Sequence, residues 1–536
     1  MHVPRPRLLM LAVAATVLVA VGSWPRASAF PNDDRTIAHV LNRTGYGPRP
    51  GDVERVRAMG LQKYIDQQLR PDRIADPVVE ARLAGFPTLT MSSKEIARKY
   101  EEPQLEQRRQ RKQDAGQKTE PDGAPKMRDP QQQKANAVLI ELSEQKLLRA
   151  VYSERQLQEV LTDFWFNHFN VDARKGPARF MLTEYERDVI RPHVLGKFRD
   201  LLEADAKSPA MLFYLDNWMS ADPNGPHVEM MPPRIVRGPF GGRRIEPARP
   251  RQQPQGKNAP KGLNENYGRE LMELHTLGVD GGYTQKDVTE VARAFTGWTI
   301  QQPRQGGGYK FEPRLHDTGQ KVVLGHVIKA GGGEGDGQAV LDILVRHPST
   351  ARFIATKLVR RFVSDDPPAA LVDRVAARFR ETDGDLRDVM RTILTSPEFL
   401  SGSYRAKVKT PFEFVASALR ATGADIQDAK PLVRSLQQFG MPLYMCQPPT
   451  GYKDTADAWV NTGALVARMN FALQLASGKM PGIVVDRLQL AGDSTQLIDS
   501  ILEGDVSPAT RATIEKATTP PQMAALTLGA PEFQRR

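Results

Sequence analysis

Residues 262–298 read GLNENYGRELMELHTLGVDGGYTQKDVTEVARAFTGW, and this stretch predicts two helices joined by a glycine-rich turn. Asn264 is a favourable N-cap for the first helix, and Gly278 is a favourable residue just beyond its end. Thr284 followed by Asp287 resembles a capping box, which predicts the start of the second helix. The rest of the chain is interpreted outward from this helix pair.

One face of the first predicted helix is polar. At about 100° per residue, polar and apolar side chains fall on opposite faces. The polar set is Glu265, Asn266, Arg269, Glu270 and Glu273, and the apolar set is Tyr267, Leu271 and Leu274. Such a polar face is consistent with the wall of a site, and equally with a solvated helix surface. The sequence therefore gives a location for a site without naming a reaction.

The first 29 residues predict a secretory signal peptide. Arg5 and Arg7 form a short basic region, residues 8–22 are apolar, and a small-residue cleavage site ends at Ala29. The apolar run is shorter than the roughly 20 residues of a membrane span, and no later stretch is apolar enough to cross a bilayer. We expect an exported protein, periplasmic or secreted, with no transmembrane span after signal cleavage. Retention as an uncleaved anchor is the alternative.

Cysteine content and charge narrow the class of protein. Cys446 is the only cysteine among 536 residues, so no internal disulfide is possible and stability depends on a large core. The formal charge is +11, and removal of Arg5, Arg7 and Arg26 with the signal peptide leaves +8. This balance suits anionic envelope or polysaccharide surroundings. No nucleic-acid-binding motif is present, so no nucleic acid is expected as a partner.

The chain as a whole predicts a mainly α, multi-helical globular protein with a small β-hairpin or flap and long loop insertions. Residues 309–311 and 322–324 flank a turn-rich segment, which predicts the hairpin. The predicted parts after the signal peptide are a helical part of the core (30–91), a charged low-complexity insertion (92–134), a helical core (135–222), a Pro/Gly/Arg-rich loop insertion (223–261), the central helix pair plus hairpin (262–330) and a C-terminal helical region (338–536). The first insertion is interpreted as mobile or as an exposed charged helix.

Residues 164–170, Phe-Trp-Phe-Asn-His-Phe-Asn, form the densest aromatic cluster of the chain and are predicted to lie in the core. His168 within this cluster has two interpretations. It is either a buried histidine that hydrogen-bonds a neighbour, or a ligand or base at the edge of a pocket.

Many of these residues form one extended pattern. Its main parts are residues 264–278 and 283–288, and it continues through Glu290, Ala292, Arg293, Phe295, Thr296, Gly297, Trp298, His316, Asp317, Leu324, Gly325, His347, Pro348, Arg361, Phe362 and residues 396–399. The pattern resembles the exported bacterial proteins grouped as domain of unknown function 1800. The chain departs from that family through its two insertions and through Gly268, where the family commonly has alanine. A glycine inside a helix costs roughly 1 kcal/mol relative to alanine, so Gly268 is interpreted as a mark of close packing.

The resemblance implies a cellular location for the protein and does not imply a reaction. The family carries no assigned activity. Its members look like envelope-associated proteins, often encoded beside exported proteins that resemble sulfatases and alkaline phosphatases. The resemblance therefore implies an exported sulfatase- or phosphatase-like protein as a partner.

Common catalytic motifs are missing from the sequence. It has neither the His-Glu-x-x-His of zinc proteases nor the Gly-x-Ser-x-Gly of serine hydrolases, and the first central helix has no Glu-x-x-His. The helix angles turn His275 toward the apolar side of the helix with Leu271, which favours a role in the core.

After these motifs are excluded, the sequence still allows a composite site, built from residues of several separate segments. Its predicted catalytic residues are Glu270, Glu273 and Glu290, and its predicted metal ligands are His168, His316 and Asp317. Carboxylates with one or two imidazoles suit Mn²⁺, Fe²⁺, Ca²⁺ or Zn²⁺, so a divalent metal is the expected cofactor of this version. Without a metal, a carboxylate pair suits acid–base work on a glycan. The competing interpretation is a structural ion network in which Arg269 and Arg293 hold the glutamates.

Two classes of function stay open at this point. The first is an exported hydrolase of an envelope or extracellular polymer. The second is a non-catalytic protein that binds or matures the sulfatase- or phosphatase-like partner. A cleft that brings Glu270, Glu273 and His316 together favours the enzyme. An exposed apolar patch, with the carboxylates locked to arginines, favours the binding protein.

Overall fold

The computed structural model describes residues 30–115, 130–225, 230–231, 234–237, 243–246, 249–250, 262–302, 305–486, 490 and 492–536. The predicted signal peptide, residues 1–29, lies outside the described residues. The described chain is mainly α, as predicted, and its strands occur only in short antiparallel pairs.

The first half of the chain supplies thirteen of the described helices. They are α1 (Asp34–Thr44), α2 (Asp52–Met59), α3 (Leu61–Gln68), α4 (Pro77–Leu83), α5 (Ser93–Ile96), α6 (Glu102–Ala115), α7 (Pro130–Tyr152), α8 (Gln156–His168), α9 (Leu182–Glu184), α10 (Phe198–Ala206), α11 (Pro209–Tyr214), α12 (Glu265–Glu273) and α13 (Gln285–Ala294).

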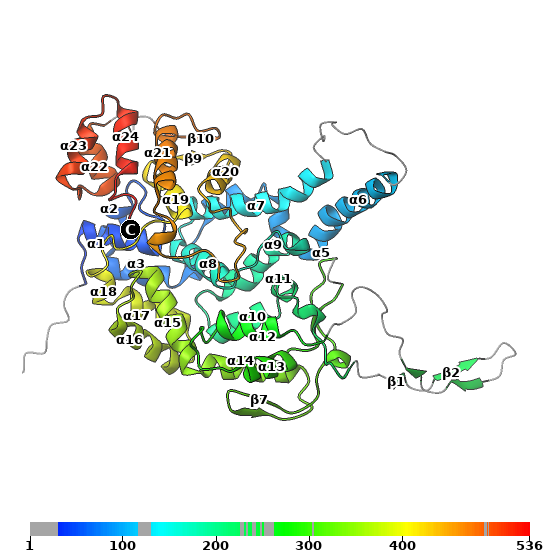
Figure 1. Ribbon diagram of the computed structural model, residues 1–536. Coiled ribbons are helices and arrows are strands. Elements are labelled where there is room, and N and C mark those ends of the chain that lie inside the picture. Colours follow the sequence, from blue (N-terminus) through cyan, green and yellow to red (C-terminus); the bar gives the residue numbers. More distant parts are fainter. Residues whose placement is uncertain are drawn as a thin grey trace, which may run out of the picture.

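The second half continues with helices that cover both ends of the molecule. They are α14 (Glu334–Arg346), α15 (Pro348–Phe362), α16 (Ala369–Glu381), α17 (Leu386–Leu394), α18 (Pro397–Leu400), α19 (Pro411–Ala421), α20 (Lys430–Gln438), α21 (Thr462–Ala476), α22 (Ser494–Leu502), α23 (Pro508–Glu515) and α24 (Pro520–Gly529). Figure 1 places α8 near the middle, with α21–α24 at one end and α13, α14 and β7 at the other.

The two central helices begin where their caps predict. The Asn264 side chain accepts a hydrogen bond from the Tyr267 amide, and Thr284 with Asp287 forms a complete capping box. Gly268 marks close packing, as expected: a Cβ added there would lie 2.8 Å from the carbonyl oxygen of Val288 on α13. The two helices therefore meet backbone to backbone at this glycine.

The β signal resolves into two hairpins instead of one. Strand β5 (Trp298–Ile300) pairs with β6 (Tyr309–Phe311), and β7 (Lys321–Val323) pairs with β8 (His326–Ile328). Leu324 and Gly325 both have positive φ, 49° and 81°, as the two central residues of a type I′ turn require. This tight turn pairs β7 with the strand that follows it, so β6 and β7 are not partners.

Three further strand pairs are also antiparallel. They are β1 (Met230–Met231) with β4 (Arg249–Pro250), β2 (Arg234–Arg237) with β3 (Arg243–Glu246), and β9 (Asp425–Ile426) with β10 (Ile483–Val484). The first two pairs fall in the predicted loop insertion at 223–261. Helix α6 and the start of α7 fall in the predicted insertion at 92–134. The predicted boundaries between parts of the chain stay predictions.

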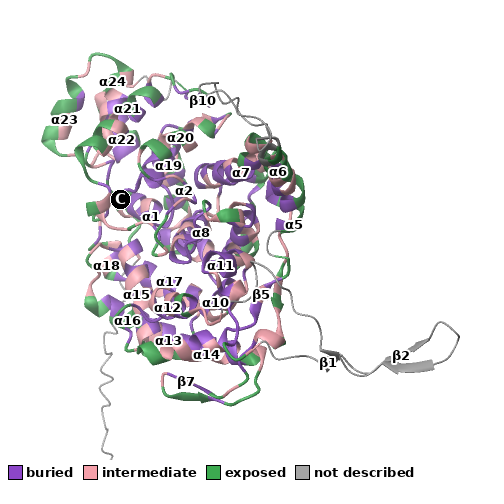
Figure 2. Ribbon diagram, turned by 45° about the vertical axis from the view of Figure 1, so that its right-hand side comes forward, coloured by how far each residue is buried: buried purple, intermediate pink, exposed green. Residues whose placement is uncertain are grey.

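The aromatic cluster of α8 is buried, as predicted. Trp165 is 1% exposed and stacks on Phe169 with a centroid distance of 6.0 Å, and it also contacts Phe198 of α10. Figure 2 shows buried ribbon through the middle of the molecule and exposed ribbon on the outer helices. No helix in the described part of the chain is both long enough and apolar enough to cross a membrane.

Candidate functional site

Arg293 of α13 joins two of the predicted site residues in an ion network. Its Nη1 donates to both carboxylate oxygens of Glu290, at 2.9 and 3.0 Å. Its Nε and Nη2 donate to the Asp317 carboxylate, at 2.7 and 3.1 Å. Glu290 also accepts the amide of Val322 at 2.8 Å, so the network ties α13 to β7. Both carboxylates are already paired with the same guanidinium.

His316 is 1% exposed, and both of its ring nitrogens have partners. Its Nδ1 donates to the carbonyl oxygen of Thr296 at 2.9 Å, and its Nε2 lies 3.2 Å from the carboxylate of Asp336. Lys321, fully buried, donates to the same carboxylate at 2.7 Å. These contacts hold the two hairpins against α14 and engage both ring nitrogens of the imidazole.

Glu270 and Glu273 stand apart from that network. The Tyr283 hydroxyl donates to Glu273 at 3.0 Å. The Glu270 carboxylate forms no hydrogen bond or ion pair with any other described residue, and burial and Glu273 both raise its pKa. Within the described ranges, no three or more His, Cys, Asp and Glu side chains are grouped to hold a metal ion. The six predicted site residues therefore do not form one site. Glu270 and Glu273 lie on α12, Glu290, His316 and Asp317 lie around the two hairpins, and His168 lies in other surroundings.

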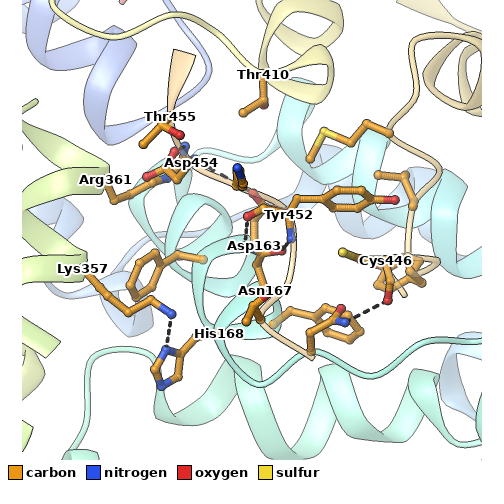
Figure 3. A pocket seen from close by; sticks show the side chains of 18 of the residues that line it. Asp163, Asn167, His168, Lys357, Arg361, Thr410, Cys446, Tyr452, Asp454 and Thr455 are labelled. Atoms are coloured by element: carbon orange, nitrogen blue, oxygen red, sulfur yellow. Dashed lines mark hydrogen bonds and ion pairs between the residues drawn. The ribbon is translucent and has the colours of Figure 1, made fainter. Parts of the chain in front are cut away.

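His168 lies at one edge of a polar cavity of about 300 Å³, here called the lysine pocket (Figure 3). Helices α7, α8 and α15 and the irregular segment 441–455 surround it. Five cations and two carboxylates line the pocket: Lys146, Lys357, Arg360, Arg361 and Lys453, with Asp163 and Asp454. The lining has three more positive than negative side chains.

Lys357 is the most unusual group in the pocket. Its Nζ donates to His168 Nδ1 at 2.8 Å, and no carboxylate among the described residues forms an ion pair with it. The His168 Nε2 donates to the carbonyl oxygen of His275 at 3.1 Å, which leaves Nδ1 as the acceptor for the lysine. Burial lowers the pKa of Lys357 to about 8, and burial together with Lys357 holds the pKa of His168 well below its usual range. The pair is thus a neutral imidazole that positions an amine titrating near neutral pH.

Arg361 lies one turn beyond Lys357 on α15 and faces the same pocket. Its Nη1 pairs with the buried carboxylate of Glu413 and reaches Asp454 at 3.4 Å. Its Nε and Nη2 are buried and have no hydrogen-bond partner in the described part of the protein. Its Nη2 also lies 3.9 Å from the carboxylate of Asp163, so three carboxylates surround Arg361. Lys357, by contrast, has His168 as its acceptor and no carboxylate partner in the described part of the protein, as expected for a site that takes an anion.

Two asparagines at the end of α8 fasten the wall of the pocket. Asn167 exchanges hydrogen bonds with the backbone of Tyr452, at 2.8 and 2.7 Å, and Asn170 donates to the carbonyl oxygens of Cys446 and Pro448, each at 2.9 Å. Gly451 has a φ of +74°, and a Cβ there would lie 2.2 Å from the backbone oxygen of Asn167. The irregular segment is thereby held at a fixed distance from α8.

The remaining reactive groups of the pocket are less suited to attack a substrate. Cys446 is buried, and burial raises the pKa of its thiol to about 11, so it remains a thiol at neutral pH. Asp163 accepts an ion pair from Lys146 at 2.6 Å. The amine of Lys357 is left as the side chain best placed to transfer a proton.

A family model described as "Protein of unknown function (DUF1800)" matches residues 39–535. The chain belongs to the DUF1800 family. The match covers both the ion network around Arg293 and the lysine pocket, so both are parts of the family domain. No curated protein and no solved structure matches the chain.

Of the residues that line the lysine pocket of this DUF1800 protein, the sequence singled out His168 as a site residue and did not single out Lys357, the lysine that His168 positions. Lys357 is 189 residues away along the chain, and its helix shows only an ordinary amphipathic pattern. Two features of the sequence could have indicated this pocket. One is a histidine between two asparagines at the end of an aromatic helix. The other is the later irregular segment 442–459, whose backbone groups need side-chain partners.

Proposed function

We propose that this protein is an exported, envelope-associated hydrolase that binds an anionic group of an envelope or extracellular polymer in the lysine pocket. In this proposal Arg361 and Lys357 receive the anion, and Lys357 transfers a proton to or from the reacting group. His168 is a positioning residue, because it orients the amine of Lys357.

One observation carries the proposal: Lys357 and Arg361 lie one turn apart on α15 and line one cavity, and Lys357 has no carboxylate partner among the described residues. Lys357 is half-buried, and a half-buried cation without a carboxylate partner is costly, so an anionic ligand would offset that cost. An amine with a pKa of about 8 is mostly protonated at pH 7 and is close enough to neutrality to donate its proton and recover it.

Anion binding is tested by calorimetric titration of the mature protein with inorganic phosphate, sulfate and acetate. We expect at least one of them to bind one-to-one, and Lys357→Met to weaken that binding at least tenfold. Lys453→Gln is the matched control, because Lys453 lines the same pocket but is 72% exposed. Equal binding by both variants, or no binding by the wild type, would refute the anion site.

Hydrolysis is tested with 4-nitrophenyl phosphate, sulfate and acetate as chromogenic probes. We expect turnover that falls as the pH rises through about 8, because Lys357 then loses its proton, and we expect Lys357→Met to remove most of that turnover. Export is tested separately by N-terminal sequencing of protein from the native host, which should begin at or near Phe30. A sequence beginning at Met1 in the membrane fraction would contradict export with cleavage.

A specific observation also favours the second class, a binding partner of an exported sulfatase- or phosphatase-like protein. Leu465, Val466 and Leu473 of α21 are 46%, 55% and 47% exposed, and the Glu290 and Asp317 carboxylates are locked to an arginine. Helices α21, α23 and α24 also surround a shallow hollow of about 300 Å³. In this version, Val466→Glu should abolish association with the partner and leave anion binding in the lysine pocket unchanged.

A further inference from the structure

A second cavity, here called the α7–α20 pocket, has a volume of about 330 Å³. One stripe of each helix lines it. On α7 the stripe is Asn136, Leu139, Ile140 and Ser143, and on α20 it is Lys430, Val433, Arg434 and Gln437. Spacings of three and four residues place each set on one helix face, so the two faces lie on opposite sides of the pocket. The two helices are neighbours in Figure 1.

The floor of this pocket is apolar. Leu139, Ile140, Val433, Leu443 and Met445 line it. Leu139 and Leu443 are buried, and the other three are half-buried, so the interior offers a continuous hydrocarbon surface with limited access to water. A volume of 330 Å³ is at the small end of the range for ligand pockets.

The charged residues of the pocket are all cationic. Its lining has four, Arg174, Arg179, Lys430 and Arg434, and no carboxylate. Arg174 is already committed, because it forks onto Asp172 and donates to the Met445 carbonyl oxygen at 3.0 Å. Lys430 lies 4.0 Å from Asp428. Arg179 and Arg434 form no ion pair or hydrogen bond with other described residues, so two guanidinium groups beside an apolar floor remain available to an anion.

The α7–α20 pocket is separate from the lysine pocket. The segment 441–446 lies between them, and Leu443 is the residue that lines both. The lysine pocket combines cations with carboxylates, whereas this one combines cations with hydrocarbon. The two cavities therefore select different ligands.

We infer that the α7–α20 pocket binds a free medium-chain carboxylate, with the alkyl chain along the apolar floor and the carboxylate at Arg179 and Arg434. Each part of the ligand matches a part of the pocket: burial of the chain supplies the affinity, and bidentate guanidinium contacts fix the orientation. This inference does not depend on the proposed hydrolase activity.

Three probes separate the contributions of chain and charge in calorimetric titrations of the mature protein. Sodium decanoate carries both features, decyltrimethylammonium has the same chain with the opposite charge, and acetate has the head group alone. We expect decanoate to bind one-to-one and at least tenfold more tightly than either of the other two. Equal affinity for decanoate and decyltrimethylammonium, or no saturable binding of decanoate, would overturn the inference.

Variants then assign the binding to this pocket. Arg179→Gln combined with Arg434→Gln should weaken decanoate binding at least tenfold, and Ile140→Asn should also weaken it. Lys134→Gln is the matched control, since it removes an exposed cation of α7 that does not line the pocket, and it should bind decanoate as the wild type does. Lys357→Met should also leave decanoate binding unchanged, which distinguishes this site from the lysine pocket. Unchanged affinity in the double arginine variant would refute the assignment.

Discussion

Gly268→Ala provides a direct test of how closely the two central helices pack. Gly268 lies in the middle of α12, where alanine is intrinsically favoured by roughly 1 kcal/mol. The added Cβ would lie 2.8 Å from the carbonyl oxygen of Val288 and 3.2 Å from the amide nitrogen of Ala292. Both are backbone atoms of α13, so no side-chain rotation relieves the clash.

The free-energy cost of separating the two helices should exceed the free energy gained from the higher helix propensity of alanine. Ordinary van der Waals contact begins near 3.4 Å, so the two helices would have to separate by several tenths of an ångström. Overpacking of this kind costs about 1–3 kcal/mol. We therefore expect Gly268→Ala to lower the free energy of unfolding by up to about 2 kcal/mol, which is the overpacking cost less the gain of roughly 1 kcal/mol in helix propensity.

The matched control is Gly335→Ala in the first turn of α14, where an added Cβ meets nothing within 4 Å. That change should leave stability unchanged or raise it by up to about 1 kcal/mol. Urea unfolding followed by circular dichroism gives the two midpoints. If Gly268→Ala is as stable as Gly335→Ala, the close approach of α12 and α13 is wrong.

Three other substitutions test the assignment of roles. Asp317→Asn should cost about 2 kcal/mol at pH 7 in denaturant unfolding, because Arg293 loses charge-assisted hydrogen bonds. The pKa of Asp317 is lowered in the folded state, so its stabilisation is present above the unfolded pKa of about 3.9 and is lost as pH falls through the folded pKa. The difference in the free energy of unfolding between wild type and Asp317→Asn should therefore shrink below about pH 4. A difference that stays constant with pH would contradict the ion pair. Glu270→Gln should change stability by less than about 0.5 kcal/mol, because its carboxylate forms no hydrogen bond or ion pair with another described residue, and a larger loss would reveal a structural contact. Lys357→Met should melt at the wild-type temperature or above it at pH 7, because it removes a half-buried cation without an ion-pair partner among the described residues. A large drop would show a structural role for the amine.

Local features were predictable from the sequence because they depend on neighbouring residues. The Asn264 cap, the Thr284 capping box and the close packing at Gly268 all involve contacts within a helix or between two consecutive helices. The pairing of β7 was not predicted, because it depends on the positive φ angles of Leu324 and Gly325, and leucine rarely adopts that conformation.

The candidate site was less predictable because it depends on contacts between distant parts of the chain. His316 and Asp317 have the chemistry of metal ligands, and only the fold reveals that Asp336 and Arg293 already occupy them. His168 was singled out as a polar ring among aromatics with two interpretations, and the structure places it 2% exposed with partners on both ring nitrogens. Its partner on α15, Lys357, has no sequence signature that distinguishes it from a surface lysine, since its low pKa comes from tertiary burial.

The lysine pocket, as proposed above, holds Lys357 as an amine that titrates near neutral pH beside a bound anion, and this assignment can be measured directly. Competitive labelling with acetic anhydride over a range of pH, followed by mass spectrometry of the peptides, measures the pKa of each lysine separately. We predict a pKa of about 8 for Lys357, in contrast to the ordinary value of about 10.4 expected for an exposed lysine. We also predict slower labelling of Lys357 in the presence of the anion that binds. Titration of Lys357 near the ordinary value of about 10.4, with no protection by any anion, would contradict this assignment.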